Sequence, residues 1–279
     1  MKTIKMILSI LLSVVILVVA QLASQLLASA ILVIGVPEFV CNVIAGILYI
    51  VFAYLLLKLL CKKYLKEEMS EYRIPRFKLN IKWVIVAIVL PAAVSAFYLL
   101  FMDGEYMCND VDMMTKLTLL SANIFFIGLG AGIVEEMVFR GIMMSAIEKR
   151  FSKKIAIIVP SVLFGVVHIL GMDFDFLSCV LVIVAGTMVG IMFSLIASET
   201  NSIWNSAIVH AIWNMVVESL EIGIEFDKYA LGSYVLESES FILTGGEFGI
   251  ESSLVAVIGY CVVSLFVVMQ ARKNGYCEE

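Results

Sequence analysis

The chain has 279 residues, of which 62% are apolar and 15% are charged, and its mean hydropathy is +1.05. Soluble domains are about half apolar and a quarter charged, so this composition excludes an ordinary soluble protein. A net charge of −5 also excludes nucleic-acid binding, which requires a broad cationic face. We therefore expect a single integral membrane domain over residues 1–279, with the lipid bilayer as its surroundings.

Eight segments approach the length and apolar character of a membrane-spanning helix, which needs about 20 mostly apolar residues. They lie at residues 6–34, 40–61, 82–102, 117–147, 155–171, 176–198, 202–221 and 252–271. The sequence predicts an all-α polytopic membrane protein with about eight transmembrane helices.

The first segment also resembles a secretory signal peptide, because Lys2 and Lys5 precede it and Ala28-Ser29-Ala30 has the form of a cleavage site. Its apolar run extends from Met6 beyond Ile34, whereas the core of a signal peptide has about 7–15 residues. The extra length favours a retained membrane span.

Basic residues collect in alternate connections, which indicates the orientation. Lys and Arg occur between residues 62 and 82, 149 and 154, and 272 and 273, whereas the connections at 103–112 and 221–251 are acidic. Cytoplasmic loops carry the excess of Lys and Arg in membrane proteins. We predict that both termini are cytoplasmic and that the 221–251 segment lies outside; its role is not indicated.

The six cysteines form no C-x-x-C pair, and most lie within or beside apolar runs. This pattern indicates neither a disulfide framework nor a thiolate metal site. We expect them to be small buried apolar residues.

Charged and polar side chains interrupt three of the predicted spans. A charge at mid-bilayer costs about 2.5–3.5 kcal/mol, so its presence requires a compensating role. Glu136 and Arg140 have the i, i+4 spacing of an intrahelical ion pair, which leaves Glu135 free on a different helix face. The affected residues are Glu135, Glu136 and Arg140 in the fourth span, His168 in the fifth, and His210 and Asn214 in the seventh.

The depth of these groups points to one site. At a rise of about 1.5 Å per residue from the basic ends of the spans, Glu135 and His168 lie about 21 Å deep, Asn214 about 20 Å and His210 about 14 Å. Each could separately be an interhelical hydrogen-bonding group, and Glu136 with Arg140 suits a structural ion pair. Their shared depth on three helices favours a catalytic cavity within the bundle.

The protease motifs that the sequence lacks limit the chemistry of the site. No H-E-x-x-H, G-x-S-G or G-D pattern points to a zincin, serine or aspartyl protease, so water is the expected nucleophile. Glu135 and His168 suit its activation, while His210 and Asn214 suit stabilisation of an oxyanion. Two imidazoles and a carboxylate could equally hold Zn²⁺, and the sequence is compatible with both versions.

At these positions the sequence resembles the CPBP family of intramembrane proteases, which includes the CAAX prenyl endopeptidases and the bacteriocin-processing and immunity (Abi) proteins. Three motifs carry the resemblance, in order and on separate spans: E-E-x-x-x-R at 135–140, F-x-x-x-H at 164–168 and H-x-x-x-N at 210–214. We expect the core that bears them to cover residues 117–217.

The resemblance implies an intramembrane endopeptidase whose substrate is a membrane-held peptide or protein, either a prenylated CAAX-type C-terminus or a leader peptide. By motif position, Glu135 and His168 would activate water, His210 and Asn214 would stabilise the oxyanion, and Glu136 and Arg140 would orient the site. Family knowledge accommodates a metal-free glutamate mechanism as well as a metalloprotease.

A second hypothesis is a non-proteolytic membrane scaffold or immunity protein, or a proton-coupled transporter that uses the buried Glu and His groups as a relay. Hydrolysis requires Asn214 and both histidines together, whereas a relay could tolerate Asn214→Ala. The sequence indicates neither the substrate nor the oligomeric state.

Overall fold

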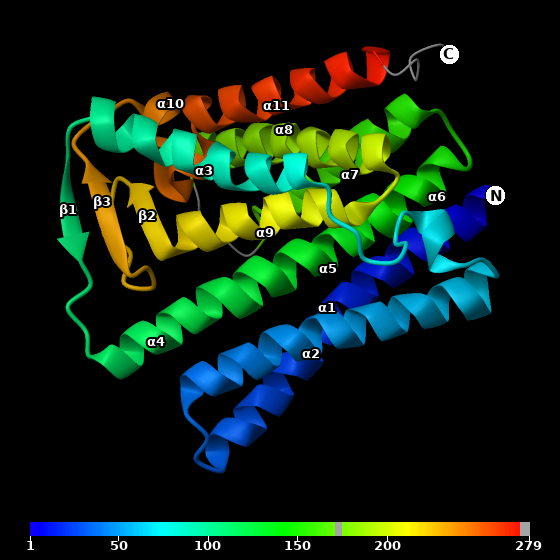
Figure 1. Cartoon of the computed structure of the whole chain (residues 1–279), viewed down its shortest axis with the longest axis horizontal. Helices are drawn as coiled ribbons and strands as arrows, with labels where there is room; N and C mark the ends of the chain where they lie inside the picture. The colour runs from blue at the N-terminus through cyan, green and yellow to red at the C-terminus, as the bar shows by residue number, and fades with distance from the viewer. Residues whose placement is uncertain (171–174, 274–279) are drawn as a thin grey trace.

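The computed structural model describes residues 1–170 and 175–273, which form an elongated bundle of helices with a small sheet at one end (Figure 1). Within these described residues, six helices are long and apolar enough to cross a membrane, by length and composition. They are α1 (Thr3–Val33), α2 (Glu38–Leu59) with its π-helical extension η1 (Leu60–Leu65), α3 (Ile81–Phe101), the helix from Met113 to Glu148, α8 (Phe176–Thr200) and α11 (Leu254–Lys273). The all-α polytopic architecture is confirmed.

The remaining two predicted spans are shorter helices, α7 (Lys153–Val167) and α9 (Ile203–Ser219). Their 15 and 17 residues give lengths of about 22 and 25 Å. The structure ends α7 at Val167, short of the predicted end at 171, which lies outside the described residues. Helix α9 packs against α3, α5 and α8, so most of its surface meets protein rather than lipid. A buried position of this kind can hold polar side chains.

The fourth predicted span is one continuous helix with changes in its hydrogen-bonding pattern. It consists of α4 (Met113–Ser121), the π-helix η3 (Ala122–Ala131), α5 (Gly132–Glu136), the π-helix η4 (Met137–Met143) and α6 (Met144–Glu148). The π-helical turns on either side of α5 alter the direction of the side chains that follow them. Such turns occur often at functional sites, and here they flank the two adjacent glutamates.

The sequence did not predict the three-stranded sheet. Strands β1 (Gly104–Cys108), β2 (Leu220–Gly223) and β3 (Gly232–Leu236) take the order β1-β3-β2, with β1 antiparallel and β2 parallel to β3. A short helix α10 (Phe241–Thr244) and the 3₁₀ turns η5 (Gly246–Phe248) and η6 (Ile250–Ser252) connect β3 to α11. The two acidic connections therefore pair with each other into one folded unit.

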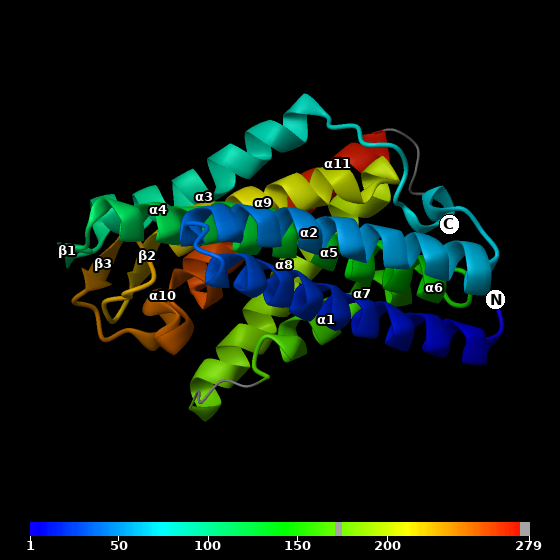
Figure 2. The ribbon, with the colours of Figure 1, turned by 90° about the horizontal axis from the view of Figure 1, so that it is seen from below.

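The two ends of the bundle differ in composition. The sheet end carries β1–β3, whereas the basic end carries the N-terminus, the 60–80 connection with its 3₁₀ turn η2 (Met69–Tyr72), the α6–α7 turn and the last turn of α11 (Figures 1 and 2). Hydrogen bonds join these segments: Lys5 Nζ donates to the Leu65 carbonyl oxygen at 2.8 Å, and Lys82 Nζ to Gln270 Oε1 at 2.6 Å. The basic connections thus gather at one end, as the charge pattern predicted.

The cysteine expectation holds in part. Among the described residues, Cys41 and Cys61 are free thiols, and both are buried. Cys108 is exposed, which corrects the expectation of burial, because it lies in the edge strand β1 rather than within a helix. Cys277 lies outside the described residues.

Candidate active site

The E-E-x-x-x-R motif places a buried ion pair on the α5–η4 segment. Arg140 Nη1 lies 2.7 Å from Glu136 Oε1, and both side chains are fully buried. Arg140 Nη2 also donates to the Gly190 carbonyl oxygen at 3.2 Å, which ties the pair to α8. Among the described residues, neither Glu136 Oε2 nor Arg140 Nε has a hydrogen-bond partner. A buried pair with orphaned atoms costs desolvation energy, so its value lies in what it positions.

Aromatic rings surround the guanidinium. The Arg140 Cζ atom lies 4.4 Å from the ring centroid of Phe164 and 5.2 Å from that of Phe193, within the range of cation–π attraction. Phe164 is the first residue of the F-x-x-x-H motif. The Phe164 ring packs against the Arg140 guanidinium and also contacts both histidine rings.

His210 lies between the two adjacent glutamates. Its Nδ1 atom is 3.3 Å from Glu136 Oε1, and its Nε2 atom is 3.8 Å from Glu135 Oε2. The second distance is too long for a direct hydrogen bond but suits an ion pair. The Glu135 side chain is 22% exposed, whereas that of Glu136 is fully buried. Sequence analysis assigned Glu135 to act with His168, whereas the structure brings it to His210.

Close helix packing makes this contact possible. A Cβ atom at Gly132 would lie 2.9 Å from the backbone N and Cα of Ala211, so only glycine allows α5 and α9 to approach this closely. Ala211 follows His210 directly. The approach therefore brings the glutamates of α5 to the imidazole of α9.

His168 caps the C-terminal end of α7. Its Nδ1 atom lies 2.6 Å from the carbonyl oxygen of Phe164, one turn earlier. An amide carbonyl only accepts hydrogen bonds, so Nδ1 is the protonated nitrogen and Nε2 carries the lone pair in the neutral ring. The Phe164 ring lies between the two imidazoles, with centroid distances of 4.5 Å to His168 and 5.7 Å to His210.

Asn214 lies one turn after His210 on the same face of α9. Its Nδ2 donates to the carbonyl oxygen of Ile127 at 3.4 Å, a long hydrogen bond to the π-helical η3 segment. A bond this long is weak, so the amide can reorient toward a ligand at little cost.

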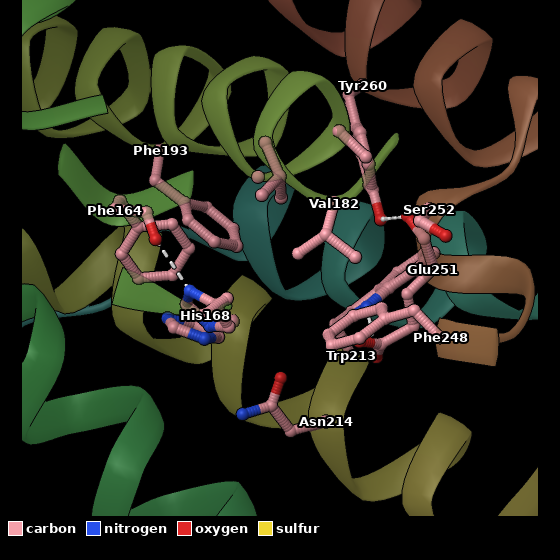
Figure 3. Close-up of a pocket in the computed structure, with 14 residues that line it drawn as sticks. Phe164, His168, Val182, Phe193, Trp213, Asn214, Phe248, Glu251, Ser252 and Tyr260 are labelled. Atoms are coloured by element: carbon pink, nitrogen blue, oxygen red, sulfur yellow. Dashed lines mark hydrogen bonds between the residues drawn. The ribbon is translucent and has the colours of Figure 1, made fainter. Parts of the chain in front are cut away.

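His168, His210 and Asn214 line one pocket between α7, α8, α9 and the segment before α11 (Figure 3). The space between its atoms is about 440 Å³, part of it open to solvent. Apolar side chains of α8 form its floor. Its lining residues are Phe164, His168, Val182, Ala185, Gly186, Val189, Phe193, His210, Trp213, Asn214, Phe248, Glu251, Ser252 and Tyr260. Glu135 is not among them and reaches the pocket through His210.

Sequence reasoning missed several pocket residues. Phe193 stacks on the His210 ring at 4.7 Å and 19°, yet it lies in a uniformly apolar span that carries no motif. Trp213 lines the pocket and could have been suspected from its place inside H-x-x-x-N. Glu251 stands immediately before the last span, where an acidic residue is ordinary.

A zinc site requires at least three donor side chains arranged around one point. Among the described residues, no group of three or more His, Cys, Asp or Glu side chains is arranged to hold a metal ion. His210 Nδ1 faces Glu136, His168 Nδ1 faces a carbonyl oxygen, and Glu135 contacts only one of the two imidazoles at short range. As they lie, these groups do not form a zinc site.

Comparison with known proteins agrees with the motifs. Residues 117–216 match the family model described as type II CAAX prenyl endopeptidase, Rce1-like. This match confirms the family resemblance in the segment that bears all three motifs, which begins within α4 and ends within α9. No curated protein matches the chain. The fold is that of a polytopic membrane protein, and residues 117–216 within it are similar to the CAAX prenyl endopeptidases.

Proposed function

We propose that the protein is an intramembrane endopeptidase that hydrolyses a peptide bond of a membrane-held substrate with a water molecule activated by Glu and His. The observation that carries the proposal is the convergence of His168, His210 and Asn214 on one pocket, with Glu135 and Glu136 behind His210. Two imidazoles, an amide and a carboxylate supply a base and oxyanion donors within one site.

His168 suits the role of base because its Nδ1 donates to the Phe164 carbonyl oxygen and its Nε2 is therefore the acceptor. Nε2 takes a proton from water as the oxygen attacks the scissile carbonyl carbon. Glu135, which lies beside His210, supports this step by accepting a hydrogen bond from the attacking water. When the C–N bond breaks, the same proton passes to the leaving amine, so the enzyme returns to its starting state.

His210 and Asn214 suit the stabilisation of the tetrahedral intermediate. When both ring nitrogens of His210 carry protons, Nδ1 donates to Glu136 and Nε2 is the remaining donor, beside the Nδ2 group of Asn214 one turn away. A preorganised donor of this kind is worth about 3–4 kcal/mol in hydrolases. Glu136 and Arg140 are positioning residues, since they act by holding His210.

We further propose that the basic end faces the cytoplasm. The N-terminus and the end of α11 lie at this end together with the Lys- and Arg-rich connections (Figure 1). The sheet, whose connections are acidic, then faces outward. The pocket itself lies between helices of the bundle.

The decisive experiment is cleavage of quenched fluorescent peptides by purified protein in detergent, with the wild type, Glu135→Gln, His168→Ala, His210→Ala and Asn214→Ala compared. We expect Glu135→Gln to abolish turnover while the fold and peptide binding persist, and Glu38→Gln, an exposed carboxyl at the start of α2, to leave turnover unchanged. Equal cleavage by all four site variants would overturn the enzymatic proposal in favour of a scaffold.

Chelation tests the metal-free form of the proposal. We expect cleavage to persist after exhaustive treatment with a chelator. Activity that is lost on chelation and restored by stoichiometric Zn²⁺ would recast Glu135, His168 and His210 as metal ligands.

A further inference from the structure

The pocket beside the histidines has a second polar wall, built by the segment between β3 and α11. Phe248, Glu251 and Ser252 of this segment line the pocket together with Trp213 of α9. Figure 3 shows Trp213, Phe248 and Glu251 on the side opposite His168, with Asn214 between the two sides. One pocket therefore joins the proposed site of hydrolysis to a carboxyl group that the hydrolysis does not use.

Glu251 is held in place from two helices. Trp213 Nε1 donates to Glu251 Oε1 at 2.9 Å, and the Tyr260 hydroxyl of α11 donates to the Glu251 backbone carbonyl oxygen at 3.1 Å. Trp213 directly precedes Asn214, so the same turn of α9 positions both the amide and the carboxyl group. This geometry fixes Glu251 at a defined distance from the reacting groups.

The backbone before Glu251 is equally constrained. Gly245, Gly246 and Gly249 adopt positive φ angles of 81°, 65° and 76°, which side chains rarely permit. A Cβ atom at Gly245 would overlap the Gly249 carbonyl oxygen. The Ser252 hydroxyl donates to the Gly245 carbonyl oxygen and closes the turn. The wall is thus a compact, internally bonded turn rather than a loose connection.

Within the part of the chain that the structure describes, the carboxyl groups around Glu251 have no counter-ion. None of the ion pairs found in residues 1–170 and 175–273 involves Glu218, Glu221 or Glu251. Burial, and then the neighbouring Glu218, raises the pKa of Glu251 to about 8. Burial, and then the charge of Glu251, raises the pKa of Glu221 to about 9. A cation placed here would remove the repulsion that these carboxyl groups share.

We propose that Glu251 is a specificity-determining residue that binds a basic side chain, Lys or Arg, of the substrate on the sheet side of the scissile bond. The inference rests on the proposed function, since it concerns the same pocket. The apolar floor formed by Val182, Ala185 and Phe193 suits the methylene stem of such a side chain. An acidic side chain at the same position meets carboxyl groups without a cation and is rejected.

Binding of peptides to the full-length Glu135→Gln protein tests the inference without cleavage. The probes are fluorescent 12-residue apolar peptides with one Lys, Leu or Glu that moves one position at a time along the sequence. At one position we expect the Lys peptide to bind at least about tenfold more tightly than its Leu and Glu counterparts, about 1.4 kcal/mol. Equal binding at every position, or a preference for Glu, overturns the inference.

Substitution of Glu251 tests whether this residue is the source of the preference for Lys peptides. Adding Glu251→Gln, whose amide oxygen can still accept from Trp213, should reduce the Lys preference to less than about twofold. Glu247→Gln is the matched control, because Glu247 is exposed and lies outside the pocket lining. A preference that persists in Glu251→Gln overturns the assignment.

The pH dependence of the Lys preference, measured with Glu251 intact, gives a second test that does not require the Glu251 variant to fold. Because Lys recognition needs the ionised carboxylate, the preference should grow as the pH rises from 7 to 9. A flat or falling preference counts against Glu251. The titratable groups that face it are Glu218 on α9, Glu221 on β2, Tyr260 on α11, and His168 and His210 across the pocket.

Cleavage of the same peptides by the wild type separates the two proposals. A Lys preference in binding without any cleavage retains the subsite and overturns the hydrolysis. Cleavage without a Lys preference retains the hydrolysis and overturns the subsite.

Discussion

Glu136 Oε1 lies 3.3 Å from His210 Nδ1, and the same oxygen receives the hydrogen bond of Arg140 Nη1 at 2.7 Å. One carboxylate oxygen therefore connects the guanidinium on η4 to the imidazole on α9. A carboxylate in this position selects the ring orientation of the histidine and leaves Nε2 directed at Glu135. The arginine, which touches neither histidine ring nitrogen, acts on the site through Glu136.

Arg140→Ala should therefore lower stability as well as activity. The substitution leaves Glu136 buried without its cation, and breaking a buried pair in this way costs about 3–5 kcal/mol. The apparent thermal midpoint in detergent and the yield of inserted protein measure the effect. Lys153→Ala, an exposed basic residue at the start of α7, is the control. A stable but inactive Arg140→Ala protein would mean that Arg140 contacts the substrate.

Gly132→Ala tests the approach of α5 to α9. The new methyl group would lie 2.9 Å from the Ala211 backbone, so the helices must separate, and overpacking of this kind costs about 1–3 kcal/mol. We expect lower thermal stability and a larger loss of turnover, because His210 moves away from both glutamates. Gly259→Ala is the matched control, since its methyl group would meet side chains rather than backbone: the flexible end of Leu90 and, at ordinary contact distance, Val94. Equal effects of the two substitutions would contradict the packing argument.

Much of this site could be predicted because the bilayer makes polar residues conspicuous. Only two histidines occur in the chain, and counting helical rise placed His168 and Asn214 near one depth. Both line the pocket. The depth of a residue does not show which side of its helix the side chain is on, however. Counting residues therefore could not show that Glu135 faces His210. The π-helical turns that set this direction leave no sequence signal.

The second polar wall of the pocket, formed by Phe248, Glu251 and Ser252, could not be predicted for a different reason. Glu251 reaches the site through a turn with three glycines at positive φ and a hydrogen bond from Trp213, and neither follows from apolar periodicity. The strands that support this wall have four or five residues each, and β1 pairs with β3 across more than 100 positions of sequence, as in Tyr106 with Tyr234. Long-range pairing of short strands has no local signal in a single sequence.

Membrane orientation is tested by labelling Cys108. This residue is exposed in the edge strand β1 at the sheet end, so a membrane-impermeant thiol reagent should modify it in intact cells. Cys277, beyond α11, should react only after the cells are opened. Cys108→Ser gives the background. Labelling of Cys277 in sealed cells would reverse the orientation.

Stability should fall as the pH rises from about 5 to 9. The folded protein holds the pKa of Glu251 at about 8 and that of Glu221 at about 9, above their value of 4.5 in an unfolded chain. Between these values the folded state binds more protons than the unfolded state, so the free energy of unfolding decreases with pH and levels off above about 9. Thermal midpoints in detergent across this range should follow the decrease. Glu221→Gln should flatten the curve, whereas Glu237→Gln should not, and a midpoint that rises with pH would contradict the burial of these carboxyl groups.

Asn214→Ala separates transition-state stabilisation from binding. If the amide stabilises the oxyanion, its loss should lower kcat by about 10²–10³ with little change in KM, because the interaction strengthens only as the carbonyl oxygen becomes charged. The weak 3.4 Å hydrogen bond to Ile127 predicts a small effect on folding. Asn42→Ala is the matched amide control, since Asn42 bonds to Thr118 and Ser121 away from the pocket and should affect stability rather than kcat. An Asn214→Ala protein that mainly raises KM would assign the amide to substrate binding, and one that cleaves as the wild type does would remove it from the mechanism.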